Sequence, residues 1–343
     1  MDKVLVLMGG PSTEHEVSLR SGAAVVRHMP AASFDPVPVV IGMDGAWRFP
    51  PARDLSSPVP ALDLSAAIAH MKACSPVCAF IAMHGAWGED GRIQALCDLM
   101  GIPHIGADAV ASAVAIDKWF AKAVYRAEGV PTPEAVLIRK RGPGSLDDLE
   151  HLARPIGLPC VVKTPRMGSS KGVFIAHDLG ELRAKVEEAL ALDERVILEA
   201  FKKGRELTVP VLEDLESGEV QALPVIEIVV RRKASAFFDY EAKYDPVATE
   251  EICPAPIPAD VAKAVQGLAI RAHLGLMLSG FSRTDFIWDG EGLWALETNT
   301  IPGLTEASLF PKAVAVAGGT FSSLIRTLVL ASLRRASRSL PVR

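Results

Sequence analysis

The sequence has few of the features that mark exported or membrane-spanning proteins. Its five cysteines are odd in number and mostly lie among apolar neighbours, which indicates reduced, buried thiols and not a disulfide framework. No apolar run reaches the roughly 18 residues that a membrane-spanning helix needs. The N-terminal apolar run, residues 4–8, is too short for the core of a signal peptide. We therefore expect a soluble, cytoplasmic protein with no membrane partner.

The chain also lacks a large excess of charge of one sign. Its 36 Lys and Arg residues against 41 Asp and Glu give a net charge of -5, which provides no electrostatic footprint for nucleic acid. Any anion must therefore be bound by a local cluster. Since 49% of the 343 residues are apolar, the chain is expected to fold, and its length favours two or three compact units.

The first third of the chain alternates between apolar runs and helical stretches. Apolar runs cover residues 4–8, 36–41 and 77–83, and helical stretches cover residues 18–28 and 92–100. This alternation predicts a parallel sheet with crossover helices.

A second, smaller α+β unit is predicted from about Asp117, with strands at 160–163 and 196–199 and a helix near 181–192. From Glu206 onward strand-like runs dominate, up to a hairpin at 289–292 and a closing helix at 321–333. The predicted fold class is therefore α/β followed by α+β.

The glycines after the first strand mark a candidate ligand site. Gly9 and Gly10 precede a helix, whose terminal N–H groups can bind anions, although the GxGxxG spacing of dinucleotide sites is missing. Thr13 and Glu16 have the spacing of a capping box, which would explain Glu16 structurally. Glu14 is then either a carboxylate favoured by the helix dipole or a substrate ligand.

A second glycine-rich segment, residues 84–91, follows a buried strand at the edge where open α/β sheets bind ligands. His84 is either part of that site or a histidine satisfied in the core. Asp90 either contributes to the site or only leads into the helix that begins near Arg92.

Lysines accompany a third glycine loop. Lys163 ends an apolar run, and residues 166–172 then predict a loop and a return strand, which either covers phosphates or forms an ordinary hairpin. The P-loop spacing is absent. Lys118 stands at a helix start, where a cation is disfavoured unless an anion lies nearby or the side chain is solvated.

The strongest pattern pairs Arg283 and Asp285 on one strand with Glu297 and Asn299 on the next. If the turn is residues 290–292, Asp285 faces Glu297 and Arg283 faces Asn299. Two facing carboxylates repel, and a divalent cation would remove that penalty. Two carboxylates and an amide oxygen suit magnesium. Solvated strand charges are the alternative.

Two irregular segments complete the candidates. Gly303, in the link after the hairpin, can offer an unobstructed N–H to a developing oxyanion. Residues 237–244 form a polar stretch with two of the three tyrosines, and this stretch is either a lid or a mobile surface loop.

Taken in order, these segments resemble the D-alanine–D-alanine ligases, from Val4 to about Leu333. The matching pieces are GGPSTEHEVS, HGAWGEDG, AIDK, VVKTPRMGSSKG, ILEAF, FDYEAKY, SRTDF and LETNTIPGLTEASL. The resemblance implies an ATP-grasp fold with an N-terminal Rossmann-like domain at 1–112, a central subdomain at 113–200 and a C-terminal subdomain at 201–335.

The implied activity is ATP-dependent joining of two D-alanine molecules through an acyl phosphate, for peptidoglycan precursors. The implied cofactors are ATP and two Mg²⁺ (or Mn²⁺) ions, the partners are small molecules and not nucleic acid, and a homodimer is compatible with the resemblance.

The resemblance also implies roles for individual residues. ATP contacts fall on Lys118, Lys163, Ser169, Glu199, Phe201, Glu206 and Lys243, and metal contacts on Asp285, Glu297 and Asn299. Catalytic roles fall on Glu14, Ser169, Tyr244, Arg283 and Gly303, and D-alanine contacts on Glu14, His84, Arg283, Ser308 and Leu309. Departures from the family pattern at Met167, Lys171, Ala200 and Lys202 concern nucleotide binding and the lid.

The nearest alternative is a related ATP-grasp ligase that uses D-lactate, D-serine or another acceptor. It would change the set formed by Glu14, Tyr244 and Ser308, all of which are present. A non-catalytic nucleotide-binding module could dispense with Arg283 and the metal carboxylates. A nicotinamide oxidoreductase would need the missing glycine fingerprint.

Overall fold

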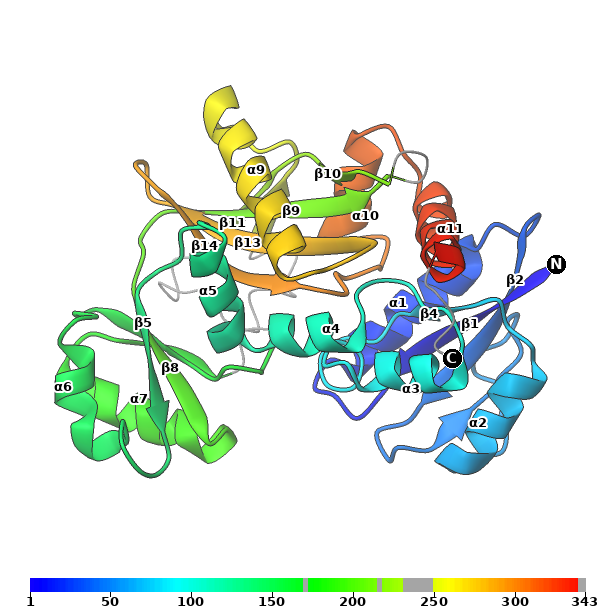
Figure 1. The fold of residues 1–343 in the computed structure, drawn as a ribbon, viewed down its shortest axis with the longest axis horizontal. Helices are drawn as coiled ribbons and strands as arrows, with labels where there is room; N and C mark the ends of the chain where they lie inside the picture. The colour runs from blue at the N-terminus through cyan, green and yellow to red at the C-terminus, as the bar shows by residue number, and fades with distance from the viewer. Residues whose placement is uncertain (169–171, 215–217, 231–248, 339–343) are drawn as a thin grey trace.

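The structure is a computed structural model that describes residues 1–168, 172–214, 218–230 and 249–338. Three β-sheets organise these residues (Figure 1). The predicted lid at 237–244, with Lys243 and Tyr244, and the loop residues Ser169 and Lys171 lie outside the described residues.

The first sheet has the predicted parallel arrangement. Strand β1 (Asp2–Gly9) pairs in parallel with β2 (Phe34–Ile41) and β4 (Cys78–Ile81), and the short β3 (Trp47–Arg48) pairs antiparallel with β2. The apolar run at residues 4–8 is buried, as an inner strand requires. The helices of this unit are α1 (His15–His28), α2 (Leu64–Ala73) and α3 (Arg92–Met100).

Helix α1 begins earlier than the sequence predicted, and the predicted capping box is wrong. The helix starts at His15 with Glu14 at the N-cap, and this end has no side-chain cap hydrogen bond. The hydroxyl of Ser12 accepts the Glu14 N–H at 3.1 Å instead. Glu16 therefore contributes only its charge to the first turn.

The second sheet is fully antiparallel, in the order β5-β8-β6-β7. Its strands are β5 (Ala135–Arg139), β6 (Cys160–Lys163), β7 (Val173–Ala176) and β8 (Arg195–Ala200). The 3-10 turn η1 (Leu146–Asp148) and the helices α6 (Leu149–Ala153) and α7 (Leu179–Leu192) complete this unit. The predicted strands, helix and return strand are confirmed here.

The third sheet carries the predicted hairpin. Its path is β12-β11-β9-β13-β14, with β10 on β9. The strands are β9 (Arg205–Glu213), β10 (Val220–Ala222), β11 (Ile226–Val230), β12 (Thr249–Ile252), β13 (Phe281–Trp288) and β14 (Leu293–Asn299). Helices α4 (Ala109–Ile116), α5 (Lys118–Ala127) and α9 (Ala259–Gly275) pack against it.

Helix α9 corrects the prediction that strand-like runs dominate after Glu206. It is a helix of 17 residues, rich in alanine, that buries Val265, Ala269 and Ala272. Spacings of four and three residues place these side chains on one face of a helix. The alanine content and this spacing favour a helix over a strand.

The last two helices return to the first sheet. Helix α11 (Phe321–Arg338) lies beside β4 and α1 (Figure 1), and α10 (Leu309–Val316) precedes it. Phe310, Ile325 and Leu328 share a buried core with the first sheet. Within the described residues, no single helix could cross a membrane by length and composition; α10 and α11 pass such a test only as a pair bent by 102°.

Candidate active site

A cavity of about 510 Å³ is lined by segments attached to all three sheets. Nine of the predicted site residues line it: Glu14, His84, Lys118, Arg283, Glu297, Asn299, Gly303, Ser308 and Leu309. The described candidates that do not line it are Lys163, Glu199, Phe201, Glu206 and Asp285. The sequence therefore predicted residues that the fold brings to one place from distant parts of the chain.

The hairpin of β13 and β14 has the predicted pairing but not the predicted turn. Arg283 pairs with Asn299, and Asp285 with Glu297. The loop covers residues 289–292, one residue longer than expected, because Trp288 already pairs with Leu293. A bulge between Asp285 and Phe286 compensates for the extra loop residue and restores the register at the site.

Protein cations balance the carboxylates of this hairpin. Arg283 donates two hydrogen bonds to Asp285, at 3.0 and 3.1 Å, and both residues are only 8% exposed. Burial alone disfavours the charged guanidinium, but Asp285 and Glu297 raise the pKa of Arg283 above its ordinary value. Solvated strand charges, the alternative for this pattern, are therefore wrong for Arg283 and Asp285.

The carboxylate of Asp285 also accepts hydrogen bonds from neighbouring strands. The Thr208 hydroxyl donates to it at 2.5 Å, and the Asn299 amide nitrogen donates at 3.3 Å. Asp285 and Glu297 thus supply two carboxylates at one sheet position, with the side chain of Asn299 beside them. Among the described residues no cluster of three or more His, Cys, Asp or Glu could hold a metal. A cation here would therefore need further oxygen ligands from phosphate and water.

Lys118 is buried at the start of helix α5 and is not solvated. Its ammonium lies 3.0 Å from a carboxylate oxygen of Glu297 and donates to the Met167 carbonyl at 2.9 Å. The N-cap residue Asp117 accepts the Trp119 N–H at 3.1 Å. The solvated-lysine alternative is therefore wrong, and an anionic partner is present.

A buried cluster of charged side chains does not line the cavity. Glu199 accepts from Lys163 at 2.8 Å and is in contact with Lys122, which is 0% exposed. Burial alone would raise the pKa of Glu199, but these two lysines hold it below its usual value. Burial lowers the pKa of Lys122 to about 8, even though Glu199 opposes this shift.

Lys122 and Tyr125 were not predicted from the sequence. The Tyr125 hydroxyl is 2.6 Å from that of Thr298, between Glu297 and Asn299 in the chain. Their spacing in the sequence could have identified them, because positions 118, 122 and 125 lie on one face of helix α5 together with buried Ala121. Polar side chains on an otherwise apolar face indicate a buried polar site.

Glu14 lies where the two glycine loops approach each other. A side-chain carbon added at Gly85 would lie 2.7 Å from a Glu14 carboxylate oxygen, and one added at Gly168 would lie 2.9 Å from it. Gly85 also has a φ of +69°, which favours glycine. Glycine at these two positions therefore leaves the space that this carboxylate occupies.

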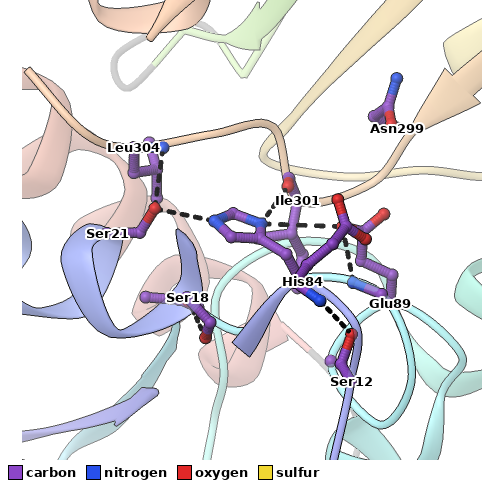
Figure 2. Close-up of polar contacts among 12 residues, drawn as sticks. Ser12, Ser18, Ser21, His84, Glu89, Asn299, Ile301 and Leu304 are labelled. Carbon is purple, nitrogen blue, oxygen red and sulfur yellow. Dashed lines mark hydrogen bonds and ion pairs between the residues drawn. The ribbon is translucent and has the colours of Figure 1, made fainter. Parts of the chain in front are cut away.

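His84 is both a satisfied buried histidine and a lining residue of the cavity. It is 3% exposed, with Nε2 at 2.8 Å from the Ser21 hydroxyl and Nδ1 at 3.0 Å from the Ile301 carbonyl (Figure 2). Glu89 lies 3.7 Å from Nδ1, and burial raises the pKa of that carboxyl. His84 is thus both a histidine with its hydrogen bonds satisfied in the core and a part of the site.

Asp90 has the structural role that the sequence left open. Its carboxylate accepts the N–H groups of Trp87 at 2.9 Å and Arg92 at 3.2 Å, and it does not line the cavity. It therefore fixes the loop that leads into helix α3.

Gly303 packs directly against Ser308. A side-chain carbon at Gly303 would lie 2.8 Å from the Ser308 hydroxyl oxygen. That oxygen accepts the Thr305 N–H at 3.1 Å and lies 2.7 Å from the Thr305 hydroxyl. Ser308 is the N-cap of α10 and Leu309 is its first residue, so a helix start faces the cavity beside Gly303.

Comparisons with known proteins agree in naming one family. The family model described as "D-ala D-ala ligase N-terminus" matches residues 3–107, and "D-ala D-ala ligase C-terminus" matches residues 124–330. A curated D-alanine–D-alanine ligase of Desulfotalea psychrophila is 42% identical over 336 residues, covering 97% of this chain and 96% of that protein. That of Desulforudis audaxviator is 39% identical over 328 residues, covering 95% and 97%.

Solved structures give the same result. The D-alanine–D-alanine ligase of Coxiella burnetii has a TM-score of 0.82 at 26% identity, covering 98% of this chain and 95% of that one. The Bacillus anthracis ligase complexed with ATP has a TM-score of 0.78 at 27% identity, with coverages of 98% and 99%. A D-Ala:D-Ser ligase of Enterococcus faecalis has a TM-score of 0.78 at 28% identity, with coverages of 96% and 99%.

Proposed function

Because this chain belongs to the D-alanine–D-alanine ligase family, with its ATP-grasp fold, we propose that it joins two D-alanine molecules into D-alanyl-D-alanine. The reaction consumes ATP, passes through an acyl phosphate and releases ADP and phosphate. The dipeptide serves peptidoglycan precursor synthesis, and we place the enzyme in the cytoplasm. The three units are assigned to residues 1–112, 113–200 and 201–335.

One observation carries this proposal: a lysine, a buried arginine, a glycine of the loop after the hairpin and the carboxylate of Glu14 all line one cavity. Lys118, Arg283 and Gly303 can stabilise negative charge, and Glu14 can bind an ammonium group. A reaction between an amino acid and ATP needs both kinds of group in one place. The 510 Å³ volume is in the range of small-molecule sites.

The nucleotide is assigned to the second and third sheets. Lys118 and Lys163 would bind the phosphates, and Glu199 beside Phe201 would accept the adenine amine. Since Lys122 also contacts Glu199, that carboxylate would still be paired with the Lys122 ammonium after Lys163 turned toward phosphate. Glu206 is assigned to the ribose, and Ser169 and Lys243, outside the described residues, to the phosphates.

Asp285, Glu297 and Asn299 would hold two Mg²⁺ or Mn²⁺ ions. Their donors are oxygens of the hard type that these ions prefer, and phosphate and water would complete the shell. The bound ions supply neutralisation of the phosphate charge. With these carboxylates bound to metal, Arg283 and Lys118 would be available to the reacting groups.

The chemistry has two steps. A carboxylate oxygen of the first D-alanine attacks the γ-phosphorus of ATP, and ADP leaves. The amine of the second D-alanine, having lost a proton, then attacks the carbonyl carbon, and phosphate leaves as the tetrahedral intermediate collapses. Arg283 and the Gly303 N–H would stabilise the oxyanion of that intermediate.

Each D-alanine has its own set of ligands. Glu14 would bind the ammonium of the first, with His84 nearby, and a link through Ser169 to Tyr244 is assigned from the family. Ser308 and Leu309 would bind the carboxylate of the second, at the start of α10 where the helix dipole favours an anion.

The first test is phosphate release by the purified protein with ATP and magnesium. D-Alanine alone should yield the dipeptide by mass, and Glu297→Gln should abolish release because it removes a metal carboxylate. Glu291→Gln is the matched control, since Glu291 is an exposed residue at the tip of the same hairpin. Equal activity of Glu297→Gln and the wild type would contradict the metal assignment.

The acceptor is tested in the same assay by adding L-alanine, D-lactate or D-serine. Turnover with D-alanine alone supports the proposal. Turnover that requires D-lactate or D-serine would retain the ATP-grasp chemistry and overturn the acceptor assignment. Light scattering would test whether the enzyme forms a homodimer, which is compatible with the family resemblance.

A further inference from the structure

Helix α1 is joined to the loop that carries Gly303 by buried polar contacts. Ser21, in the second turn of α1, has its hydroxyl 3.3 Å from the Leu304 backbone nitrogen and 2.8 Å from His84 Nε2. His84 Nδ1 is 3.0 Å from the Ile301 carbonyl (Figure 2). The loop is therefore held on both sides of Gly303 by groups from the first sheet's unit.

For a neutral His84 imidazole, the chemistry of these groups gives the direction of each hydrogen bond. The Ile301 carbonyl can only accept, so His84 Nδ1 carries the hydrogen. In a neutral imidazole Nε2 is then an acceptor, so the Ser21 hydroxyl donates to it. The Leu304 N–H donates to the Ser21 oxygen. One continuous relay thus runs from Leu304 through Ser21 and His84 to Ile301.

Burial shields this relay from water. Ser21 and Leu304 are 0% exposed, and His84 and Ile301 are 3% exposed. Hydrogen bonds shielded from water are stronger, and a connected chain loses more than one contact when a member is removed. Because Leu304 and Ile301 bracket residues 302 and 303, the relay restricts where the Gly303 N–H can point.

We propose that Ser21 is a positioning residue for the ligase reaction: through Leu304 and His84 it holds the Gly303 N–H at the oxyanion of the tetrahedral intermediate. The inference rests on the proposed function. Ser21 does not line the cavity, so it acts through the loop and not on the substrate. Its helix begins directly after Glu14, so one element positions both the amine ligand and the oxyanion donor.

Ser18 provides a matched control on the same helix. It is also 0% exposed, and its hydroxyl donates to the Ala82 carbonyl at 2.9 Å and accepts the Gly9 N–H at 2.8 Å. Both partners belong to the first sheet's unit and neither belongs to the loop at 301–304. Ser18→Ala therefore removes a comparable pair of buried bonds without touching the relay.

The experiment compares Ser21→Ala and Ser18→Ala in dipeptide synthesis and thermal unfolding. Both variants should lower the unfolding midpoint by similar amounts. Ser21→Ala should lower kcat by roughly 10- to 100-fold, because small misplacements at a reacting centre have effects of about this size. Its KM for ATP should stay within about twofold, and Ser18→Ala should keep kcat within about threefold.

Two results would overturn the inference. One is a kcat of Ser21→Ala equal to that of the wild type, and the other is an equal loss of kcat in Ser18→Ala, which would indicate a general structural effect. If Ser21→Ala does not fold, Ser21→Cys carries the test, because sulfur is a weak donor and acceptor. That variant should lose at least roughly fivefold in kcat, and an unchanged kcat would count against the inference.

A double-mutant comparison adds a second readout. In the His84→Asn background Ser21→Ala should cost much less in kcat than in the wild type, because residues of one relay are not independent. Additive losses would contradict the relay. Absence of dipeptide synthesis by the wild type would instead overturn the proposed function, and with it this inference.

Discussion

Replacing Gly303 by alanine tests the loop that carries the oxyanion donor. The added carbon would lie 2.8 Å from the Ser308 hydroxyl oxygen and 3.3 Å from the Ser308 Cβ. The first distance is too short for a stable contact, while the second is only tight. Either Ser308 rotates or the Gly303 backbone shifts by a few tenths of an ångström.

The magnitude follows from what holds Ser308. Rotation breaks its hydrogen bonds with the Thr305 N–H at 3.1 Å and the Thr305 hydroxyl at 2.7 Å, at about 1 kcal/mol each. We expect the free energy of unfolding to fall by about 1–2 kcal/mol. A displaced Gly303 N–H should lower kcat by roughly 10- to 100-fold, since loss of a whole oxyanion donor costs about 10²–10³.

The assay is dipeptide synthesis with Gly303→Ala, Ser308→Ala and the double variant. Ser308→Ala removes the clashing oxygen, so adding Gly303→Ala to it should cost less than about threefold in kcat. Gly267→Ala is the control: this exposed position in α9 has nothing within 4 Å. It should gain about 0.5–1 kcal/mol of stability with kcat unchanged. Equal losses from Gly303→Ala with and without Ser308→Ala would contradict a clash with the Ser308 oxygen.

Three further predictions concern charge. Arg283→Lys should lower kcat by roughly 10- to 100-fold and raise KM less, because lysine cannot reproduce the paired bonds to Asp285; steady-state kinetics checks this. Folded Lys122 has a pKa of about 8 against an ordinary 10.5, so between these two pH values the unfolded chain binds the proton and the folded protein does not. Stability should therefore rise with pH, and urea unfolding should show the wild type more stable, relative to Lys122→Met, at pH 10 than at pH 7.5. An equal difference between the two proteins at both pH values would contradict this prediction. Burial raises the pKa of Cys78 to about 11 and of Cys97 to about 12, so peptide mapping after a thiol reagent at pH 8 should find both unmodified in the folded protein.

Local patterns predicted most of the strands and the pairs at the hairpin. Arg283 and Asp285 lie on the same face of β13 because side chains alternate along a strand, and this alternation does not depend on the length of the turn. The pairing with Glu297 and Asn299 was correct even though the turn was not, because the bulge offset the longer loop. The family resemblance predicted nine residues that line the cavity and five described residues that do not.

Contacts between distant segments could not be read from spacing. Ser21 and Leu304 are 283 positions apart, and nothing near Ser21 distinguishes it from other small residues of an apolar helix face. The start of α1 shows a second limit of prediction from sequence. Two hydroxyls that can accept a backbone N–H, those of Ser12 and Thr13, are adjacent in the chain, and the folded glycine turn decides that Ser12 is the acceptor. Helix α9 was not predicted, although its alanine content and the spacing of its buried residues favour a helix.

The packing of α11 on the first sheet has a consequence for biosynthesis. Cys78 in β4 and Ser332 in α11 lie 3.0 Å apart although 254 positions separate them. A ribosome therefore completes the strands of the first sheet long before it makes the helix that covers them. Until then an apolar surface stays open on the nascent chain, where it can bind a chaperone or a neighbouring chain. The first-made unit is thus completed only when the last-made helix emerges.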